Sequence, residues 1–181
     1  MNEARADLWS YIGKVDAIFI TTNMAAKNNG NAVMGRGCAF EAATRWPNIP
    51  NVLGRYLMQG NHFPVPLWRI GPTDVAGQLP TQLWSFPVKD KGFVPQTPEE
   101  LNSLVTTQQV PRMSVGKFVP SWARKASLEL IADSARYIQA LDIKSAVLPR
   151  PGCGAGELDW DTVSETLHSI LDDRFTCTTW K

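Results

Sequence analysis

Two glycine-rich loops, each placed after an apolar run and before a stretch of helical character, restrict what this chain of 181 residues can fold into. The first loop, 23–37, follows the β-branched run Ala17–Thr22, and the second loop, Arg150–Glu157, follows the apolar run Lys144–Leu148. Short runs of this kind predict buried strands. Strands that alternate with helices in this way predict an α/β fold.

Capping residues and apolar periodicity place the remaining elements. Ser121 and Asp159 each precede apolar residues at helical spacing, so each is expected to cap a helix. We expect helices over 38–46, 122–141 and 159–171, and strands over 17–22, 61–70, 79–88, 144–148 and 174–180. The chain has no internal repeat and no linker, which predicts a single domain over residues 1–181.

The segment 90–120 interrupts this alternation. It is rich in glycine, proline, glutamine and threonine, which predicts mostly irregular structure. It carries one helix-start signal, in which Thr97 is the cap, Pro98 takes the first helical position and Glu100 closes a capping box. A connection this long inside a domain is more often a functional lid or a disordered stretch than a neutral loop. We call this segment the insertion.

Composition excludes several function classes. Lys and Arg number 18 against 17 for Asp and Glu, so the net charge of +1 gives no large basic field for non-specific DNA binding. Three widely spaced cysteines and two histidines predict no disulfide framework, no metal site and no cofactor. The chain has no apolar run near the roughly 20 residues of a membrane span and no signal peptide. We expect a reduced, cytoplasmic, monomeric protein without membrane contact.

The tryptophans do not by themselves indicate nucleic-acid binding. Stacking of bases on aromatic side chains is one use of such residues. Packing in or at the edge of the core is the simpler interpretation. We assign that role to Trp46, Trp68, Trp84 and Trp122.

The two loops have the composition of an anion-binding site. Glycine lets the backbone come close to a phosphate and adopt positive φ angles, and exposed N–H groups in such loops bind anions. In α/β sheets, ligands bind beyond the carboxyl ends of the strands, where both loops are expected. Neither loop matches the Walker pattern, and neither gives the Gly-x-Gly-x-x-Gly of a dinucleotide fold.

The two loops together resemble those of macrodomains. Asn23 followed by Val-Met-Gly-Arg-Gly at 33–37 resembles the first ligand loop of that family, and Gly-Cys-Gly-Ala-Gly at 152–156 resembles the second. The resemblance runs from about Asp7 to the end, the insertion excepted. It is greatest to the branch of DNA-ADP-ribosyl glycohydrolase antitoxins and terminal ADP-ribose glycohydrolases. It implies a three-layer α/β/α macrodomain with a mixed central sheet that binds ADP-ribose.

The resemblance also implies roles for individual residues. Asp7 would accept a hydrogen bond from the adenine, Asn23 would bind the distal ribose, and the second loop would hold the diphosphate. The residues implied to bind ADP-ribose are Asp7, Leu8, Asn23, Met34, Gly35, Arg36, Gly37, Pro151, Gly152, Cys153, Gly154, Ala155, Gly156 and Trp180. We interpret Cys153 as a small buried residue and not a nucleophile, because no base lies near it in sequence.

The residues alone leave other interpretations open. Asp7 is also compatible with a solvated position near the N-terminus, and Trp180 with an exposed terminal side chain. Asn23 is also compatible with an Asx turn that ends a strand.

Lys89 is the candidate catalytic residue. It ends the segment Phe-Pro-Val-Lys at 86–89, and a Phe-Pro-x-Lys segment supplies the catalytic lysine in the glycohydrolase branch. A neutral amine could attack the anomeric carbon of an opened distal ribose and give an imine, whereas an ammonium could protonate the leaving group. The first route needs a lowered pKa, which burial provides. A solvated lysine that leads into a loop is the alternative.

Two departures from the branch bear on the substrate. Asp90, Lys91 and Gly92 follow the lysine where many relatives have His and Trp. Gly156 stands where protein-directed glycohydrolases carry Asp and DNA-directed relatives carry Gly, which favours DNA.

Four hypotheses about function remain at this point. The first is a glycohydrolase that removes ADP-ribose from DNA bases or protein side chains through Lys89, with a cognate ADP-ribosyltransferase as a possible partner. The second is a non-catalytic ADP-ribose reader. The third is an ADP-ribose-1″-phosphate phosphatase, and the fourth is an interaction module with a degenerate pocket.

Overall fold

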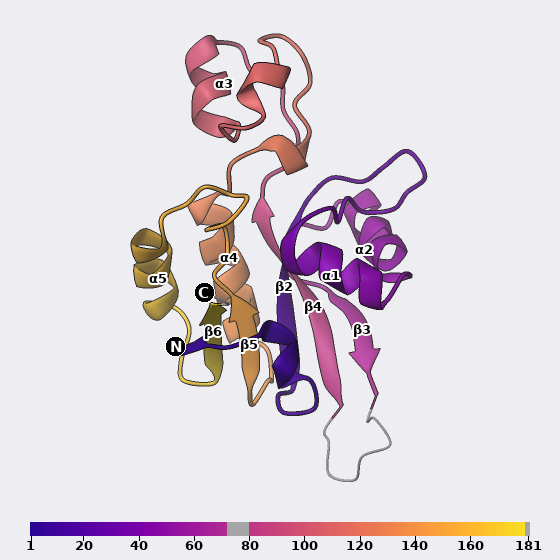
Figure 1. Cartoon of the computed structure of the whole chain (residues 1–181), viewed down its shortest axis with the longest axis vertical. Helices are drawn as coiled ribbons and strands as arrows, with labels where there is room; N and C mark the ends of the chain where they lie inside the picture. Colours follow the sequence, from indigo (N-terminus) through magenta and orange to yellow (C-terminus); the bar gives the residue numbers. More distant parts are fainter. Residues whose placement is uncertain (72–79, 180–181) are drawn as a thin grey trace.

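A six-stranded mixed sheet forms the centre of the computed structural model, which describes residues 1–71 and 80–179 (Figure 1). Its strands are β1 (Asn2–Arg5), β2 (Ala17–Asn23), β3 (Pro66–Ile70), β4 (Thr81–Lys89), β5 (Ala146–Pro149) and β6 (Phe175–Thr179). The strand order is β1-β6-β5-β2-β4-β3. Only β3 within this sheet pairs antiparallel, so the predicted mixed sheet is confirmed.

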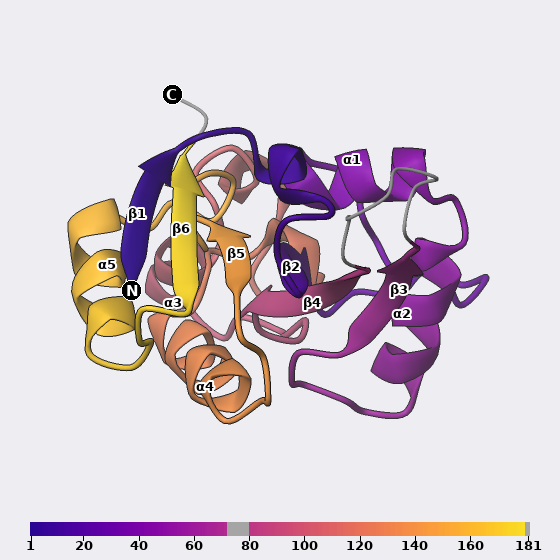
Figure 2. The same ribbon diagram turned by 90° about the horizontal axis from the view of Figure 1, so that it is seen from below.

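Helices cover both faces of the sheet. On one face lie α4 (Leu128–Gln139) and α5 (Trp160–His168), and on the other lie α1 (Gly37–Arg45), α2 (Ile49–Met58) and the 3-10 turn η1 (Leu8–Tyr11). Figure 2 shows α1 and α4 on opposite sides of the sheet. The three-layer α/β/α arrangement is therefore confirmed.

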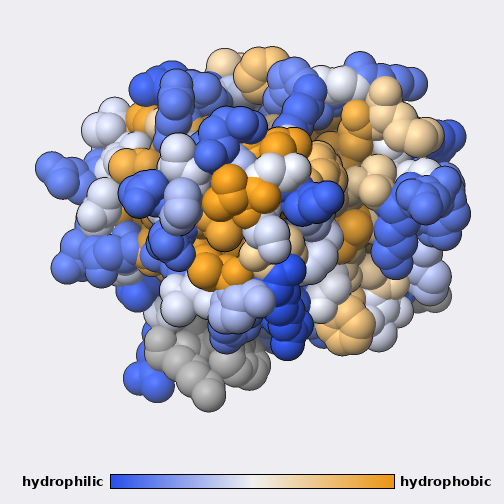
Figure 3. All heavy atoms as spheres, turned by 90° about the horizontal axis from the view of Figure 1, so that it is seen from above, coloured by the Kyte–Doolittle hydropathy of each residue, from blue (hydrophilic) through white to orange (hydrophobic). Residues whose placement is uncertain are grey.

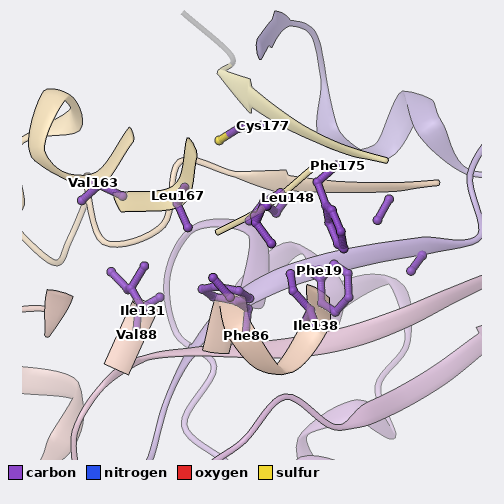
Figure 4. Packing of buried hydrophobic residues seen from close by; sticks show 14 of the residues in the cluster. Phe19, Phe86, Val88, Ile131, Ile138, Leu148, Val163, Leu167, Phe175 and Cys177 are labelled. Carbon is purple, nitrogen blue, oxygen red and sulfur yellow. The ribbon is translucent and has the colours of Figure 1, made fainter. Parts of the chain in front are cut away.

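The alternation of side chains along β2 explains the two cores. Phe19 points to the α4 side and packs against Phe86 with ring centroids 6.4 Å apart, whereas Ile18 and Ile20 point to the α1 side. Figure 4 shows side chains of the parallel strands meeting those of α4 and α5. Successive residues of a strand face opposite sides, so one apolar run can supply both cores.

The predicted start of the long helix is wrong. Ser121–Ala123 forms only a 3-10 turn, and α4 begins at Leu128, where the Ser127 hydroxyl accepts a hydrogen bond from the Leu130 N–H. The intervening backbone makes distant contacts: the Lys125 N–H donates to the Leu104 carbonyl and the Ala126 N–H to the Gly156 carbonyl. These bonds hold the chain extended and prevent an earlier helix.

Other boundaries differ from the predictions in smaller ways. The helix at 38–46 and the Asp159 cap are confirmed, but the helix after Asp159 ends at His168. The strand expected over 61–70 begins only at Pro66. The edge strand β1 and the helix α2 were not predicted. Within residues 1–71 and 80–179, no helix has the length and apolar character to cross a bilayer.

The insertion has more structure than its composition predicts. It contains α3 (Pro98–Leu104), the 3-10 turn η2 (Val110–Arg112), and a bridge between Phe93 and Val119. The expected cap is confirmed, because the Thr97 hydroxyl accepts from the Glu100 N–H at 3.1 Å. The predicted capping box is wrong in its second half, because the Glu100 carboxylate accepts from the Gln96 N–H, one residue before the cap. A small apolar cluster supports it, formed by Leu101, Val105, Val119 and Ala123. In Figure 1 the insertion lies beyond the carboxyl end of β4.

Candidate functional site

A cleft of about 440 Å³ opens at the carboxyl ends of β2, β4 and β5. Both glycine-rich loops line it, as predicted for ligand sites in α/β sheets. The third wall comes from the insertion. Figure 3 looks down on this end of the molecule, where apolar surface gathers among hydrophilic side chains. A cleft of this size can hold a nucleotide-sized ligand.

The predicted site residues divide into two groups. Those that line the cleft are Asn23, Met34, Gly35, Arg36, Gly37, Lys89, Gly152, Gly154, Ala155 and Gly156. Asp7, Leu8, Pro151 and Cys153 are not among the lining residues. Trp180 lies outside the described residues.

Asn23 lies at the end of β2, where a register shift pairs it directly with Lys89 on β4. Its Oδ1 accepts from the Ala25 N–H at 2.8 Å, and its Nδ2 donates to the Val33 carbonyl at 2.9 Å. The first contact is an Asx turn, and the second ties the far end of the first loop to the strand. The amide keeps a second N–H and a second lone pair that a sugar hydroxyl could use.

The first loop ends as the start of α1. Gly37 has a φ of 56°, and Arg36 at the cap position makes no side-chain cap bond to this helix. Gly37, Cys38 and Ala39 line the cleft. The N-terminal end of the helix dipole therefore borders the cleft and favours an anion there.

Two glycines of the second loop are required by packing. Gly152 has a φ of 78°, and a Cβ there would lie 2.9 Å from the Cδ1 of Ile131. A Cβ on Gly156 would lie 2.5 Å from the Gly152 carbonyl oxygen. An aspartate at 156 would therefore force this loop apart, so the glycine at this position follows from local packing whatever the substrate.

Gly154 differs from these two. A Cβ there would meet nothing within 4 Å, yet the residue lines the cleft. The fold of this chain thus does not need a glycine at 154. A ligand that approaches the loop backbone closely would need one.

Residues away from the cleft have structural roles. The Asp7 carboxylate caps η1 by accepting from the Trp9 N–H, and Leu8 is buried in the core. Burial raises the pKa of the Cys153 thiol to about 11, so the neutral thiol predominates near pH 7. Cys153 packs against the core on the α4 side but is only partly buried, so it is less enclosed than predicted.

Lys89 is buried, and the interpretation as a solvated lysine is wrong. Only 7% of its surface is exposed, and its Nζ donates to the Ala155 carbonyl at 2.8 Å and to the Trp122 carbonyl at 3.1 Å. Burial lowers its pKa from 10.5 to about 8; the Glu157 carboxylate opposes this shift and the Arg36 guanidinium adds to it. A useful fraction of the amine is therefore neutral near pH 7.

The insertion contributes residues that the sequence analysis missed. Thr106 and Gln109 of the insertion line the cleft. Trp122 lines it too, from the 3-10 turn Ser121–Ala123 directly after the insertion, although it was predicted to lie in or at the edge of the core. Trp122 is 40% exposed. No local pattern marks these residues; the only signal was that the insertion directly follows the candidate lysine.

Two contacts join the insertion to both loops. The Glu157 carboxylate accepts from the Thr107 N–H at 2.8 Å and from the Thr107 hydroxyl at 2.9 Å. The Arg36 guanidinium donates to the Gln108 side-chain oxygen at 3.2 Å. The segment between Thr106 and Gln109 thus spans from one loop to the other.

The donor set of the described residues does not suit a metal. Among residues 1–71 and 80–179, no group of three or more His, Cys, Asp or Glu side chains could hold an ion. The charged residues that line the cleft are Arg36, Lys89 and Arg150. This lining suits an anionic ligand.

Comparison with known proteins gives structural neighbours only. No protein-family model matches the chain, and no curated protein matches it. The macrodomain of Thermus aquaticus DarG aligns with a TM-score of 0.58 at 19% identity, over 99% of this chain and 97% of that one. The macrodomain of Mycobacterium tuberculosis DarG aligns with a TM-score of 0.57 at 19% identity, over 98% of this chain and 95% of that one.

A third neighbour was determined with a ligand. Thermosipho africanus DarTG in complex with ADP-ribose aligns with a TM-score of 0.66 at 15% identity, over 98% of this chain and 41% of that one. At these identities the likeness concerns the fold. The chain therefore has the macrodomain fold, shared with the macrodomains of DarG proteins.

Proposed function

We propose that this chain binds ADP-ribose in the cleft and hydrolyses the bond between the distal ribose and a DNA base or a protein side chain. The observation that carries the proposal is the buried amine of Lys89, whose pKa is about 8 and which lines the cleft beside Asn23. A buried lysine with a lowered pKa in a cleft is typical of nucleophilic catalysis.

The binding frame supports an elongated, doubly negative ligand. The diphosphate would lie between Gly154 and the start of α1, where backbone N–H groups and the helix dipole favour negative charge. Arg36 and Arg150 add positive charge at the two loops. The distal ribose would then lie near Asn23 and Lys89, which are paired across β2 and β4.

The hydrogen bonds of Lys89 suit an attacking amine. A neutral amine can donate its two hydrogens to the Trp122 and Ala155 carbonyls and keep its lone pair for the cleft. The nitrogen would attack C1″ of the opened ribose, and the bond from C1″ to the base or side chain would break as that group takes a proton. Water would then hydrolyse the imine, which releases ADP-ribose and restores the amine.

A second candidate function is an ADP-ribose reader without catalysis. The same two carbonyl contacts favour it, because they also hold Lys89 as a structural tie between the second loop and the turn at Trp122. Macrodomain architecture alone does not separate the two functions.

The test compares wild type with Lys89→Met on ADP-ribosylated single-stranded DNA and on ADP-ribosylated protein. Lys91→Met is the matched control, because Lys91 is exposed and does not line the cleft. We expect wild type and Lys91→Met to release ADP-ribose from one of these substrates and Lys89→Met to release none, while all three bind free ADP-ribose in calorimetry. Binding without release in wild type supports the reader, and release by Lys89→Met refutes the role of the lysine.

A further inference from the structure

A short segment of the insertion crosses the cleft from one ligand loop to the other. We call residues 106–109 the strap. Thr106 and Gln109 at its ends are buried and line the cleft, whereas Thr107 and Gln108 between them are exposed. In Figure 1 the insertion lies beyond the carboxyl end of β4, at the end of the sheet where the cleft opens. The strap therefore separates this part of the cleft from solvent.

The contact of the strap with the second loop is the stronger of its two ties. Both oxygens of the Glu157 carboxylate accept bonds from Thr107, from its N–H at 2.8 Å and from its hydroxyl at 2.9 Å. We call this contact the latch. On the first loop, Arg36 donates to the neutral carboxamide of Gln108 at 3.2 Å. A phosphate is a better partner for a guanidinium than a carboxamide is, so a bound anion would compete for Arg36 and leave the latch as the remaining tie.

The backbone at Glu157 indicates a dedicated role for its side chain. Its φ is 61°, the only positive φ of a non-glycine residue among residues 1–71 and 80–179. This left-handed conformation favours glycine and is unfavourable for a residue with a Cβ. Strain of this kind is concentrated at functional sites. The bonds that the carboxylate accepts from Thr107 are a use that offsets the strain.

The latch is joined to the part of the second loop that faces the cleft. The Glu157 N–H donates to the Gly154 carbonyl at 3.1 Å, and the Ala155 carbonyl between them accepts from the Lys89 amine. Burial lowers the pKa of Lys89 to about 8, and the Glu157 carboxylate opposes this shift. The carboxylate of the latch therefore also acts on the charge of the candidate catalytic amine.

The latch can break while the insertion stays folded. Its bonds are exposed to solvent, and exposed bonds open more readily than buried ones. The insertion is held separately by its apolar cluster, and Thr106 donates twice to the Ala123 carbonyl, at 3.0 Å and 3.2 Å. Loss of the latch therefore separates the strap from the second loop and leaves these contacts in place.

We propose that the strap is a gate: the latch holds it closed over the cleft, and a ligand enters or leaves when the bonds between Glu157 and Thr107 break. The gate concerns access to the cleft, so it does not depend on the reaction that the cleft carries out. Weakening the latch raises the rates of both association and dissociation and changes their ratio less. A clamp that only retains bound ligand would affect dissociation alone.

The first test needs no ligand. The Cys38 thiol lines the cleft, so the rate at which N-ethylmaleimide alkylates it reports how often the gate is open. Thr107→Val removes the hydroxyl of the latch, and Glu157→Gly removes the carboxylate at a backbone angle that glycine adopts freely. Thr166→Val is the matched control, because that hydroxyl bonds within α5. Cys177 is buried, so its alkylation reports global unfolding.

We expect both latch variants to be alkylated at Cys38 about threefold to tenfold faster than wild type at one pH, the size expected for loss of one or two hydrogen bonds. The control should match wild type, and the rate at Cys177 should stay unchanged in all proteins. Mass spectrometry of the digested protein distinguishes the cysteines.

The second test measures the association and dissociation of ADP-ribose by stopped flow, with tryptophan fluorescence as the signal because Trp122 lines the cleft. Both rate constants should rise by a similar factor in Thr107→Val. This variant keeps the charge of Glu157, so the pH profile of ADP-ribose release should keep the midpoint of wild type. The effect of the latch on access is thereby separated from the effect of the carboxylate on Lys89.

Three results would overturn the gate. An unchanged rate at Cys38 in both latch variants would show that the strap is no barrier. A rise in the dissociation rate alone would show a clamp. Equal acceleration at Cys38 and Cys177 would show that the latch supports the whole fold. If wild type does not bind ADP-ribose, the proposed function fails, whereas the alkylation rates still decide the gate.

Discussion

Raising the pH from 7 to 9 should speed the release of ADP-ribose about tenfold, because Lys89, with a pKa of about 8, loses its proton over this interval. About one tenth of the amine is neutral at pH 7 and about nine tenths at pH 9. Only the neutral amine has a lone pair for attack on C1″. If the ammonium acted instead as an acid, the rate would fall over the same range.

The assay follows single-turnover release from the DNA substrate at saturating enzyme, so that binding and product release do not limit the rate. Lys91→Met serves as the control and should give the same profile as wild type. Reduction with borohydride during turnover should convert the imine into a stable bond between ADP-ribose and Lys89. Mass spectrometry of the digested protein would locate that bond.

Two results would refute this reasoning. A rate of release that falls between pH 7 and pH 9 would show that the ammonium form of Lys89 acts as an acid. A flat profile, with no adduct after reduction, would mean that Lys89 takes no part in the chemistry and only ties the second loop to the turn at Trp122.

Three further predictions test the surroundings of the site. Glu157→Gln removes the carboxylate that raises the Lys89 pKa, so the midpoint of the pH profile should move to lower pH. Gly156→Asp should lower the free energy of unfolding by about 1–3 kcal/mol and the melting temperature by several degrees. Gly154→Ala should have the melting temperature of wild type. Phe86→Ala removes a fully buried ring and should lower the free energy of unfolding, measured with denaturant, by about 3–5 kcal/mol. A loss below about 1 kcal/mol would contradict the packing of Phe86 in the core.

Features decided by near neighbours in the chain could be predicted from sequence. The Asp159 carboxylate accepts from the N–H groups two and three residues ahead, and Thr97 acts in the same local way. The run Ala17–Thr22 is a buried strand because its residues are apolar or β-branched on both faces. The two caps depend on short-range contacts, and the strand was predictable from the apolar character of its own residues.

Features decided by distant contacts could not be predicted. Ser121 and Ser127 are equally good helix caps by local rules, and the bond from Ala126 to the second loop selects Ser127. Gln108 and Gln109 are adjacent and identical, yet one is exposed and the other buried at the cleft. Only the fold of the insertion against both loops makes that distinction, so no sequence pattern marks Gln109.

In the proposed function, the cleft between the two loops binds the diphosphate of ADP-ribose. The most direct measurement is calorimetric titration of ADP-ribose into wild type, Gly154→Asp and Gly71→Asp. Among residues 1–71 and 80–179, a Cβ added to either glycine would meet no atom within 4 Å, so neither aspartate clashes with the described part of the fold, but only Gly154 lines the cleft.

Like charges facing each other in a binding site cost several kcal/mol, so Gly154→Asp should weaken binding at least about a hundredfold. Gly71→Asp adds the same charge and should bind like wild type. Absence of binding by wild type, or equal affinity in all three proteins, would contradict the account.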